Sequence, residues 1–338
     1  MRLIMMGTGP FAVPVFQTIL TTPHESVALV TAPIRARRGR SAQSVSPMRD
    51  MAHAEDVPVF DPENVNSPEA QAMLRGLDGD LLVVCDYGQI LSAETLATAR
   101  LGGINLHGSL LPKYRGAAPI NWAIFHGEEE TGVSVIHMTP QVDAGPVIAQ
   151  AHVPIGPEET AVDLEERMAE MGAWLTRRAI DAVESGRLEA LPQDPQQASR
   201  APRLKKEHGR VDWSWTARQI RDQIRAMEPW PKTYTFWHRR EGDPIRMILG
   251  PADVVDRRAL AEEDDLAEPT RRRALEAGPG EVILADRGRL IIGTGGEPAE
   301  GALAPRALQP AGKRLMPVDV FLRGYRVEVG DRFGPQDE

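Results

Sequence analysis

The stretch GINLHGSLLPKYRGAAPI, residues 103–120, holds the most distinctive group of polar residues in this chain. Asn105 and His107 are separated by one residue, so in a β-strand both side chains point to the same face of the sheet. A loop follows, and Pro119 is suited to the first turn of a helix. Polar groups at the carboxyl end of a strand, ahead of a helix, are typical of the ligand crevice in an open α/β sheet. We therefore expect a functional site here.

The flanking sequence supports an open α/β sheet. Residues 2–6 predict a short strand that leads through a glycine turn into a helix. Residues 80–85 form a continuous apolar run, which is typical of a parallel strand buried on both faces. Residues 132–138 and 147–153 predict two further strands joined by a loop that carries Asp143. A long amphipathic helix is predicted from residue 160 to residue 183.

Asn-x-His is a short pattern, and the simpler interpretation makes Asn105 a turn cap and His107 a half-buried, hydrogen-bonded histidine. The longer pattern is much more specific, because Asn-x-His is followed at once by Ser-Leu-Leu-Pro-x-x-Arg-Gly and later by Asp143-Ala-Gly-Pro. This combination resembles the folate-dependent formyltransferases. Within this superfamily, the sequence of residues 109–120 is most similar to that of the methionyl-tRNA formyltransferases.

The resemblance implies a formyl transfer from 10-formyltetrahydrofolate to the amino group of methionyl initiator tRNA, for translation initiation. It implies that Asn105, His107 and Asp143 are catalytic and that the folate binds against Ser109, Leu110, Leu111 and Pro112. The segment 86–91 is similar to the loop that contacts the pterin ring, although the family more often has Ala at the position of Asp86. A simple turn there is an equally good interpretation of the residues alone.

The transfer passes through a tetrahedral intermediate, so the site must stabilise an oxyanion and manage one proton on each nitrogen. Asn105 and His107 can point at the formyl oxygen, and Asp143 can orient His107 and help to deprotonate the attacking amine. No side-chain nucleophile is required. Cys85 is a poor candidate for one because an apolar strand raises the pKa of a thiol.

The charge distribution predicts where a polyanion could bind. The chain has a net charge of −9, but residues 1–199 carry 14 Lys and Arg against 25 Asp and Glu, whereas residues 200–338 carry 25 against 23. No acid lies between Glu25 and Asp50, where five arginines occur. The loop 34–46 is similar to a family arm that reaches the acceptor end of the tRNA. The chain departs here from the usual family sequence and has Gly39 where the family has arginine, so the resemblance assigns the tRNA-binding role to Arg38 or Arg40.

The length of 338 residues predicts two domains. We expect a Rossmann-like formyltransferase domain over residues 1–189, a linker over 190–206 rich in Pro and Gln, and a second domain over 207–330. Five short β-rich runs in the last region predict a small OB-like β-barrel that binds tRNA. The sequence of this region also resembles that of the family's carboxyl-terminal domain. Residues 255–277 look like a charged surface insertion.

Cys85 is the only cysteine, and no Cys/His cluster has the spacing of a zinc site. The residues therefore predict a reducing, cytoplasmic location and no metal. No apolar run approaches the ~20 residues of a membrane span, and the amino terminus does not resemble a signal peptide. We expect no membrane association and no obligatory protein partner.

Three alternatives stay open. A nicotinamide dehydrogenase is suggested by Gly7-x-Gly9-x-x-Ala12, but that fingerprint also needs an acid at the end of the second strand, and none occurs before Asp50. A non-catalytic RNA-binding module would not need Asn105, His107 or Asp143 for binding. A folate-dependent formyltransferase that acts on another amine, such as a sugar amine or a glycinamide, is the nearest alternative.

Overall fold

The computed structural model describes residues 1–34, 47–186, 189–286, 288–296 and 301–336. Arg38 and Arg40 lie outside these residues. The chain divides into two compact units. The first unit contains residues 1–120, 129–156 and 163–203, and the second contains 121–128, 157–162 and 204–338.

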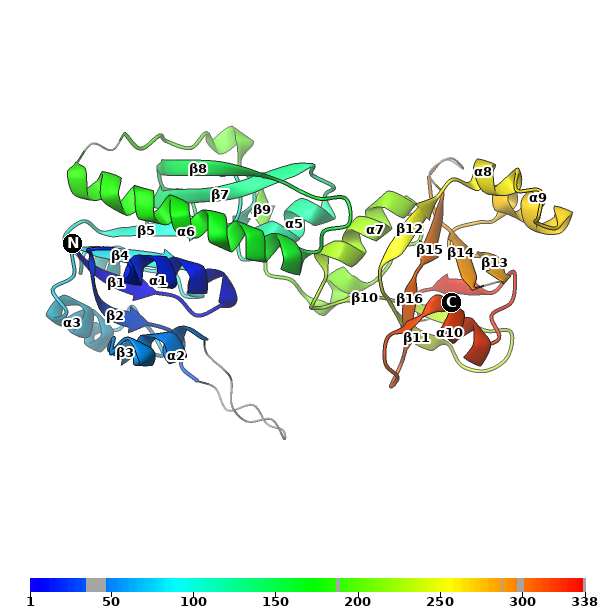
Figure 1. The fold of residues 1–338 in the computed structure, drawn as a ribbon, viewed down its shortest axis with the longest axis horizontal. Coiled ribbons are helices and arrows are strands. Elements are labelled where there is room, and N and C mark those ends of the chain that lie inside the picture. Colours follow the sequence, from blue (N-terminus) through cyan, green and yellow to red (C-terminus); the bar gives the residue numbers. More distant parts are fainter. Residues whose placement is uncertain (35–46, 187–188, 287, 297–300, 337–338) are drawn as a thin grey trace. The chain divides into compact units, whose positions relative to one another are not determined.

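The first unit is built on a seven-stranded sheet with the order β3-β2-β1-β4-β5-β7-β8 (Figure 1). The first five of these strands in sheet order run parallel, and β7 and β8 add an antiparallel edge. Every residue of β4 is buried, as the apolar run at this position predicts. The strands are β1 (Arg2–Met6), β2 (Glu25–Val30), β3 (Val59–Phe60), β4 (Leu81–Cys85), β5 (Gly103–His107), β7 (Glu130–His137) and β8 (Val147–Pro154).

Helices cover both faces of this sheet. The long helix α6 runs along one face, where Gly172 packs against Leu106 of β5 (Figure 1). Leu74 and Leu96, from α3 and α4, pack on the other face, which also includes Val84 of β4. Val84 pairs with Asn105, so Asn105 and His107 point to the face opposite α6. The helices of this unit are α1 (Val13–Leu20), α2 (Pro47–Ala54), α3 (Pro68–Gly76), α4 (Ala93–Leu96) and α6 (Ala161–Ser185), with the 3-10 turn η1 (Pro10–Ala12). Helix α5 (Pro119–Phe125) begins in the first unit, and its residues from 121 on belong to the second.

The segment expected to be a linker is more ordered than its composition suggests. Strand β9 (Arg200–Ala201) pairs in parallel with β6 (Arg115–Gly116), and Leu191 pairs with Val147. The 3-10 turn η2 (Pro195–Gln197) lies between these two attachments. Residues up to 203 therefore belong to the first unit.

The second unit confirms the prediction of a β-rich domain, but its strands form two antiparallel sheets. Their orders are β17-β16-β11-β10-β18 and β12-β15-β14-β13. Strand pairings among the described residues do not close into a barrel. The strands are β10 (Thr233–His238), β11 (Ile245–Leu249), β12 (Ala252–Val255), β13 (Val282–Asp286), β14 (Arg289–Gly293), β15 (Ala302–Pro305), β16 (Ala307–Pro310), β17 (Met316–Pro317) and β18 (Arg332–Gly334).

A core rich in aromatic side chains holds this unit together. Trp237 stacks on Phe333 with ring centroids 6.4 Å apart, and its indole Nε1 donates to Asp331 at 3.0 Å. Helix α7 closes the core with the buried Ile220 and Ile224. The helices are α7 (Ala217–Ala226), α8 (Arg257–Ala261), α9 (Glu268–Glu276) and α10 (Val318–Gly324), with the 3-10 turn η3 (Lys206–Gly209).

Residues 255–277 are not simply a charged surface insertion. Helices α8 and α9 occupy most of this range and contribute Leu260 and Ala274 to a hydrophobic cluster with Ile283. The buried guanidinium of Arg257 donates to the carbonyl oxygens of Ala274 and Ala277. The apolar residues among the charges thus supply a small core of their own.

Candidate active site

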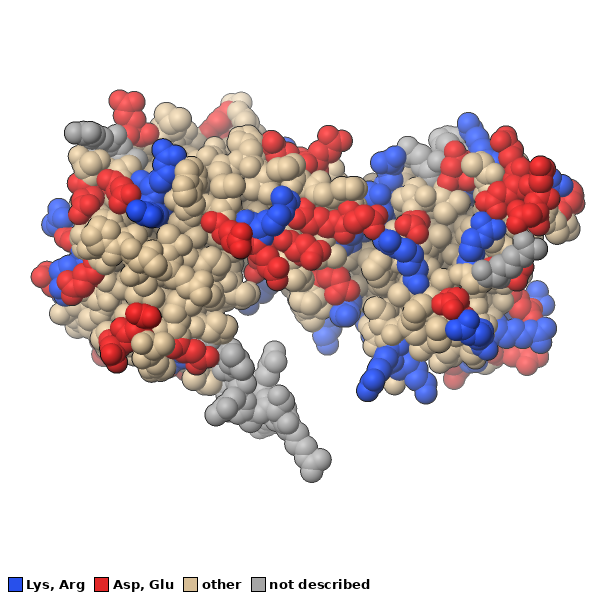
Figure 2. Space-filling model, viewed as in Figure 1, with Lys and Arg blue, Asp and Glu red and all other residues tan. Residues whose placement is uncertain are grey.

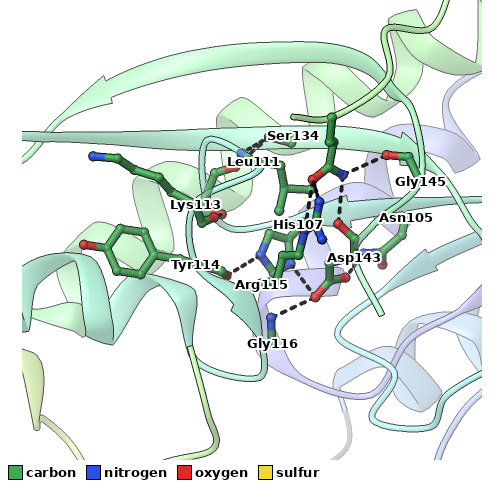
Figure 3. Close-up of polar contacts among 12 residues, drawn as sticks. Asn105, His107, Leu111, Lys113, Tyr114, Arg115, Gly116, Ser134, Asp143 and Gly145 are labelled. Carbon is green, nitrogen blue, oxygen red and sulfur yellow. Dashed lines mark hydrogen bonds and ion pairs between the residues drawn. The ribbon is translucent and has the colours of Figure 1, made fainter. Parts of the chain in front are cut away.

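Strand β5 presents its two polar side chains at the carboxyl end of the sheet. Asn105 is half-buried and His107 is buried, and both point away from the α6 face. The loop between β7 and β8 brings Asp143 to the same place (Figure 3). The three residues that the sequence analysis selected as catalytic therefore lie together, although Asp143 is 38 residues from Asn105 in the chain.

The imidazole of His107 lies between a carbonyl group and a carboxylate. Its Nε2 is 2.9 Å from the carbonyl oxygen of Tyr114, and its Nδ1 is 3.6 Å from Asp143 Oδ2 (Figure 3). A carbonyl oxygen can only accept, so Nε2 carries a proton and donates. Nδ1 then faces the carboxylate, and a second proton on this atom creates an ion pair with Asp143. The geometry thus leaves Nδ1 as the ring nitrogen that faces the carboxylate.

Each carboxylate oxygen of Asp143 has a separate neighbour. Oδ1 is 3.5 Å from the Asn105 amide nitrogen, and Oδ2 accepts from the backbone nitrogen of Gly116 at 2.9 Å. Asp143 has a φ of 51°, a left-handed conformation that Asp and Asn tolerate better than most residues. A Cβ at Gly145 would overlap the carbonyl oxygen of His137, so this tight loop also requires glycine.

The loop of Asp143 is held by residues that the sequence analysis missed. Gln193 Nε2 donates to the carbonyl oxygens of Asp143 at 2.8 Å and Gly145 at 2.7 Å. Gln193 Oε1 accepts from Arg115 Nε at 3.1 Å and from Arg115 Nη2 at 2.6 Å. Arg115 lay within the quoted motif, but nothing in the sequence distinguishes Gln193 from the other polar residues of the predicted linker.

The candidate folate loop, residues 109–112, is held by hydrogen bonds to the adjoining residue Lys113 and to Ser134 of β7. Ser109 Oγ donates to the carbonyl oxygen of Lys113 at 2.6 Å, and Ser134 Oγ accepts from Leu111 N at 3.0 Å. Ser109 and Leu111 are buried, whereas Leu110 and Pro112 are half-buried. The loop is therefore preorganised, and Leu110 and Pro112 are the two residues with side-chain surface left for a ligand.

The glycine turn after β1 is already engaged by the chain itself. The backbone nitrogens of Thr8 and Gly9 point at the carbonyl oxygen of Asp86, at 3.0 and 3.3 Å. A Cβ at Gly9 would overlap the Asp86 carboxylate, so this acid lies directly against the turn. A dinucleotide needs these amides for its phosphates and would meet a negative charge instead. This argues against the dehydrogenase alternative.

Two acids near this turn have raised pKa values. Partial burial of its carboxyl group raises the pKa of Asp86 to about 6, although the residue as a whole is exposed. Burial, followed by the charges of Asp86 and Glu166, raises the pKa of Glu165 to about 6. Burial also raises the pKa of Cys85 well above its ordinary value, which agrees with a structural rather than a nucleophilic cysteine.

The basic pairs of the second unit, Lys205-Lys206 and Lys313-Arg314, are all exposed. Figure 2 shows Lys and Arg groups at several places on this unit, interspersed with Asp and Glu on the face drawn. No helix of the described chain is long and apolar enough to cross a membrane. The described part of the chain also contains no group of three His, Cys, Asp or Glu residues placed to hold a metal ion.

Comparison with known sequences decides the family. The Formyl transferase family matches residues 1–180, and the family described as Formyl transferase, C-terminal domain, matches residues 203–326. The methionyl-tRNA formyltransferase of Rhodopirellula baltica is 41% identical over 344 residues, which cover 98% of this chain and 96% of that protein. The chain belongs to the methionyl-tRNA formyltransferase family. The family member from Moorella thermoacetica is 38% identical and covers 99% of both chains.

Solved structures share the fold at low sequence identity. The sugar 3N-formyltransferase WlaRD, solved with dTDP and 5-N-formyl-THF, has a TM-score of 0.60 and 18% identity, and the match covers 93% of this chain and 99% of that one. The N-formyltransferase from Helicobacter canadensis, solved with folinic acid and dTDP-3-aminofucose, has a TM-score of 0.62 and 18% identity, with 91% and 98% coverage. Both share the fold of this chain, and the matches extend into its second domain.

Proposed function

We propose that this protein transfers the formyl group of 10-formyltetrahydrofolate to the amino group of methionyl initiator tRNA. The family membership over the whole chain supports the reaction and both substrates. The observation that carries the mechanism is the convergence of Asn105, His107 and Asp143 at the carboxyl end of β5.

The reaction begins when the methionyl amine attacks the formyl carbon. The carbonyl oxygen becomes an oxyanion, and the Asn105 amide can donate to it. Because the Asn105 contact to Asp143 is long, at 3.5 Å, the amide can turn toward the substrate at little cost. A donor in this position is typically worth about 3–4 kcal/mol of transition-state stabilisation. A proton on Nδ1 would give His107 a positive charge beside the same oxygen.

One proton must leave the attacking nitrogen, and one must reach the departing folate nitrogen. An α-amino group titrates near about pH 8, so a modest base is sufficient. Asp143 can accept the first proton directly or through a water molecule, and its contact with His107 provides a route to the second nitrogen. No covalent enzyme intermediate is needed in this sequence.

The folate is proposed to bind against residues 109–112, with Leu110 and Pro112 providing the surface. The hydrogen bonds of Ser109 and Ser134 keep this loop in one conformation before the folate arrives. A preorganised loop loses less conformational entropy on binding. The apolar Leu110 suits the flat, largely apolar face of a pterin ring.

The tRNA is proposed to contact two surfaces. Arg38 or Arg40 would reach the acceptor end, and this part of the proposal rests on sequence because the loop lies outside the described residues. The second domain, an OB-like tRNA-binding unit in this proposal, would supply further phosphate contacts. Its exposed pairs Lys205-Lys206 and Lys313-Arg314 are suited to that role.

The test is a comparison of acceptors with the full chain. Purified protein is incubated with 10-formyltetrahydrofolate and, in separate reactions, charged initiator tRNA, a nucleotide-linked amino sugar or a glycinamide. We expect formylmethionine from the tRNA reaction at a kcat/KM far above those of the small amines. Faster formylation of a small amine would show that this amine, and not methionyl-tRNA, is the acceptor. The proposed formyl chemistry would still hold. The low-identity sugar formyltransferases make the amino sugar the most informative competitor.

A further inference from the structure

The segment 191–201 forms hydrogen bonds with the loops of the candidate site at several residues. Leu191 and Val147 exchange two backbone hydrogen bonds of 2.8 Å, at the end of the loop that carries Asp143. Ser199 Oγ accepts from the backbone nitrogen of Tyr114 at 2.8 Å, and Ser199 O accepts from Arg115 N at 2.9 Å. A segment with the composition of a linker is therefore bound to both loops that contact His107.

Gln193 has the best-defined contacts in this segment. Of residues 191–200, only Gln193 is not exposed. Its amide nitrogen donates to two carbonyl oxygens, those of Asp143 and Gly145, and its amide oxygen accepts two bonds from Arg115. The opposite orientation of the amide would place oxygen against oxygen and nitrogen against guanidinium, so the partners fix one orientation. All four hydrogen-bonding opportunities are used by protein groups.

The hydrogen bonds of Gln193 are connected to His107 through one residue, Asp143. Gln193 holds the main chain of Asp143, whose carboxylate lies 3.6 Å from His107 Nδ1. Arg115 holds Gln193, and the residue after Arg115 donates its backbone nitrogen to the same carboxylate at 2.9 Å. The strained φ of 51° at Asp143 needs outside support, which the two hydrogen bonds from Gln193 supply.

We propose that Gln193 is a positioning residue that acts through Asp143, and that Arg115 fixes the Gln193 amide. The proposal rests on the formyltransferase function given above, because it assigns Gln193 a part in that reaction. Gln193 does not need to touch either substrate. A displacement of the Asp143 carboxylate by even about 1 Å can cost two orders of magnitude in rate.

The first experiment measures kcat and both KM values for Gln193→Ala and Gln193→Glu. The glutamate keeps the length of the side chain and the contact with Arg115, but when ionised it cannot donate to the two carbonyl oxygens. We expect both variants to lower kcat by about 10- to 100-fold with KM values within a few-fold of wild type. Gln197→Ala is the matched control, because Gln197 is exposed on the same segment and its side-chain amide donates to Asp194 rather than to the loop of Asp143. Wild-type kcat in Gln193→Ala, or an equal loss in Gln197→Ala, overturns the proposal.

The second experiment separates positioning from general loss of structure. Gln193→Ala is combined with Asp143→Asn, and the effects on kcat are compared in a double-mutant cycle. If Gln193 acts through Asp143, its removal costs little once the carboxylate is gone. Full additivity would show that Gln193 acts elsewhere and would overturn the proposal. Melting temperatures of the four proteins identify a loss that comes from unfolding.

A third measurement does not require turnover. The nitrogen-15 chemical shift of His107 Nδ1 reports whether this atom is protonated and hydrogen-bonded. This shift depends on the distance from Nδ1 to Asp143. Gln193→Ala should change this signal, whereas Gln197→Ala should not. An unchanged signal overturns the positioning role. If the wild-type protein does not formylate methionyl-tRNA, the proposed function fails, and this measurement still decides the role of Gln193.

Discussion

His107 Nδ1 lies 3.6 Å from Asp143 Oδ2, while the other ring nitrogen donates to the carbonyl oxygen of Tyr114. The carbonyl fixes the ring and the proton on Nε2, so a proton can be exchanged only on the side of Asp143. The same carboxylate reaches toward Asn105 with its second oxygen. One acid therefore connects the proposed oxyanion donor with the proposed proton carrier.

Removal of the Asn105 amide should affect the chemical step and leave binding largely intact. Asn105→Ala should lower kcat by about 100- to 1,000-fold, the loss typical of one oxyanion donor. KM for the folate and for the tRNA should change little, because the donor acts mainly in the transition state. Steady-state kinetics with both substrates provides the measurement. A raised KM at unchanged kcat would assign Asn105 to substrate binding instead.

The loop of Asp143 should not tolerate a side chain at Gly145. Gly145→Ala places a Cβ on the carbonyl oxygen of His137, so we expect a loss of about 1–3 kcal/mol in the free energy of unfolding together with lower activity. Gly76→Ala is the control, because that glycine ends α3 and a Cβ there meets no atom within 4 Å. The control should be neutral or slightly stabilising. Thermal melts and formylation rates test both, and equal melting temperatures would refute the steric argument.

Glu165 should make the protein less stable as the pH rises. Its pKa in the folded protein is about 6 against an ordinary 4.5, so the folded state holds the proton more tightly than the unfolded state. The penalty on the charged form is absent below about pH 4.5 and complete above about pH 6. Glu165→Gln should therefore raise the melting temperature at pH 7.5 and have little effect near pH 4.5. Equal effects at the two pH values would show that the pKa is not raised.

We choose Glu165 for this test rather than Asp86. Part of the Asp86 residue reaches solvent, so its raised pKa translates less directly into stability. Asp86 also lies against the Gly7–Gly9 turn, so its replacement would change backbone contacts as well as charge.

The arginines of the loop 34–46 should contribute to tRNA binding through phosphate contacts. Residues 1–199 carry an excess of acids, so this part of the chain needs a local basic segment to approach a polyanion. Replacement of Arg38 and Arg40 by Ala should weaken tRNA binding and reduce its salt dependence, by roughly one unit of slope per lost phosphate contact. Binding of free folate should not change. Unaltered tRNA affinity and salt slope would show that these arginines do not contact the tRNA.

Much of the first unit could be predicted because its central strands β1, β4 and β5 are short and largely buried. The apolar run in residues 80–85 predicted a central strand, which is β4 (Leu81–Cys85), and the two-residue spacing of Asn105 and His107 predicted their common face. Asp143 was grouped with them through the family resemblance, and the structure explains the grouping because β7, the strand before its loop, pairs with β5. The strand pattern predicted the common face of Asn105 and His107, but their assignment to the site together with Asp143 came from the family resemblance.

The role of Gln193 and the sheets of the second unit could not be predicted from local sequence patterns. Residues 190–206 have no apolar periodicity, and their order comes from pairing with β6 and Val147, which are distant in sequence. One of the five β-rich runs of the sequence comprises residues 303–308, and the structure divides it between β15 and β16, which belong to different sheets. Sheet membership depends on long-range pairing, so the run could not show it.

The replacement of Asp143 by Asn tests the catalytic assignment most directly. Asn keeps the size of the side chain and tolerates the φ of 51°, so the loop should stay folded while the proton acceptor is removed. The measurement is the single-turnover rate of formyl transfer to methionyl initiator tRNA, with enzyme and folate in excess. We predict a rate at least about 100-fold below wild type, with unchanged folate binding. A single-turnover rate close to that of the wild-type protein would contradict the role of Asp143 in the chemistry.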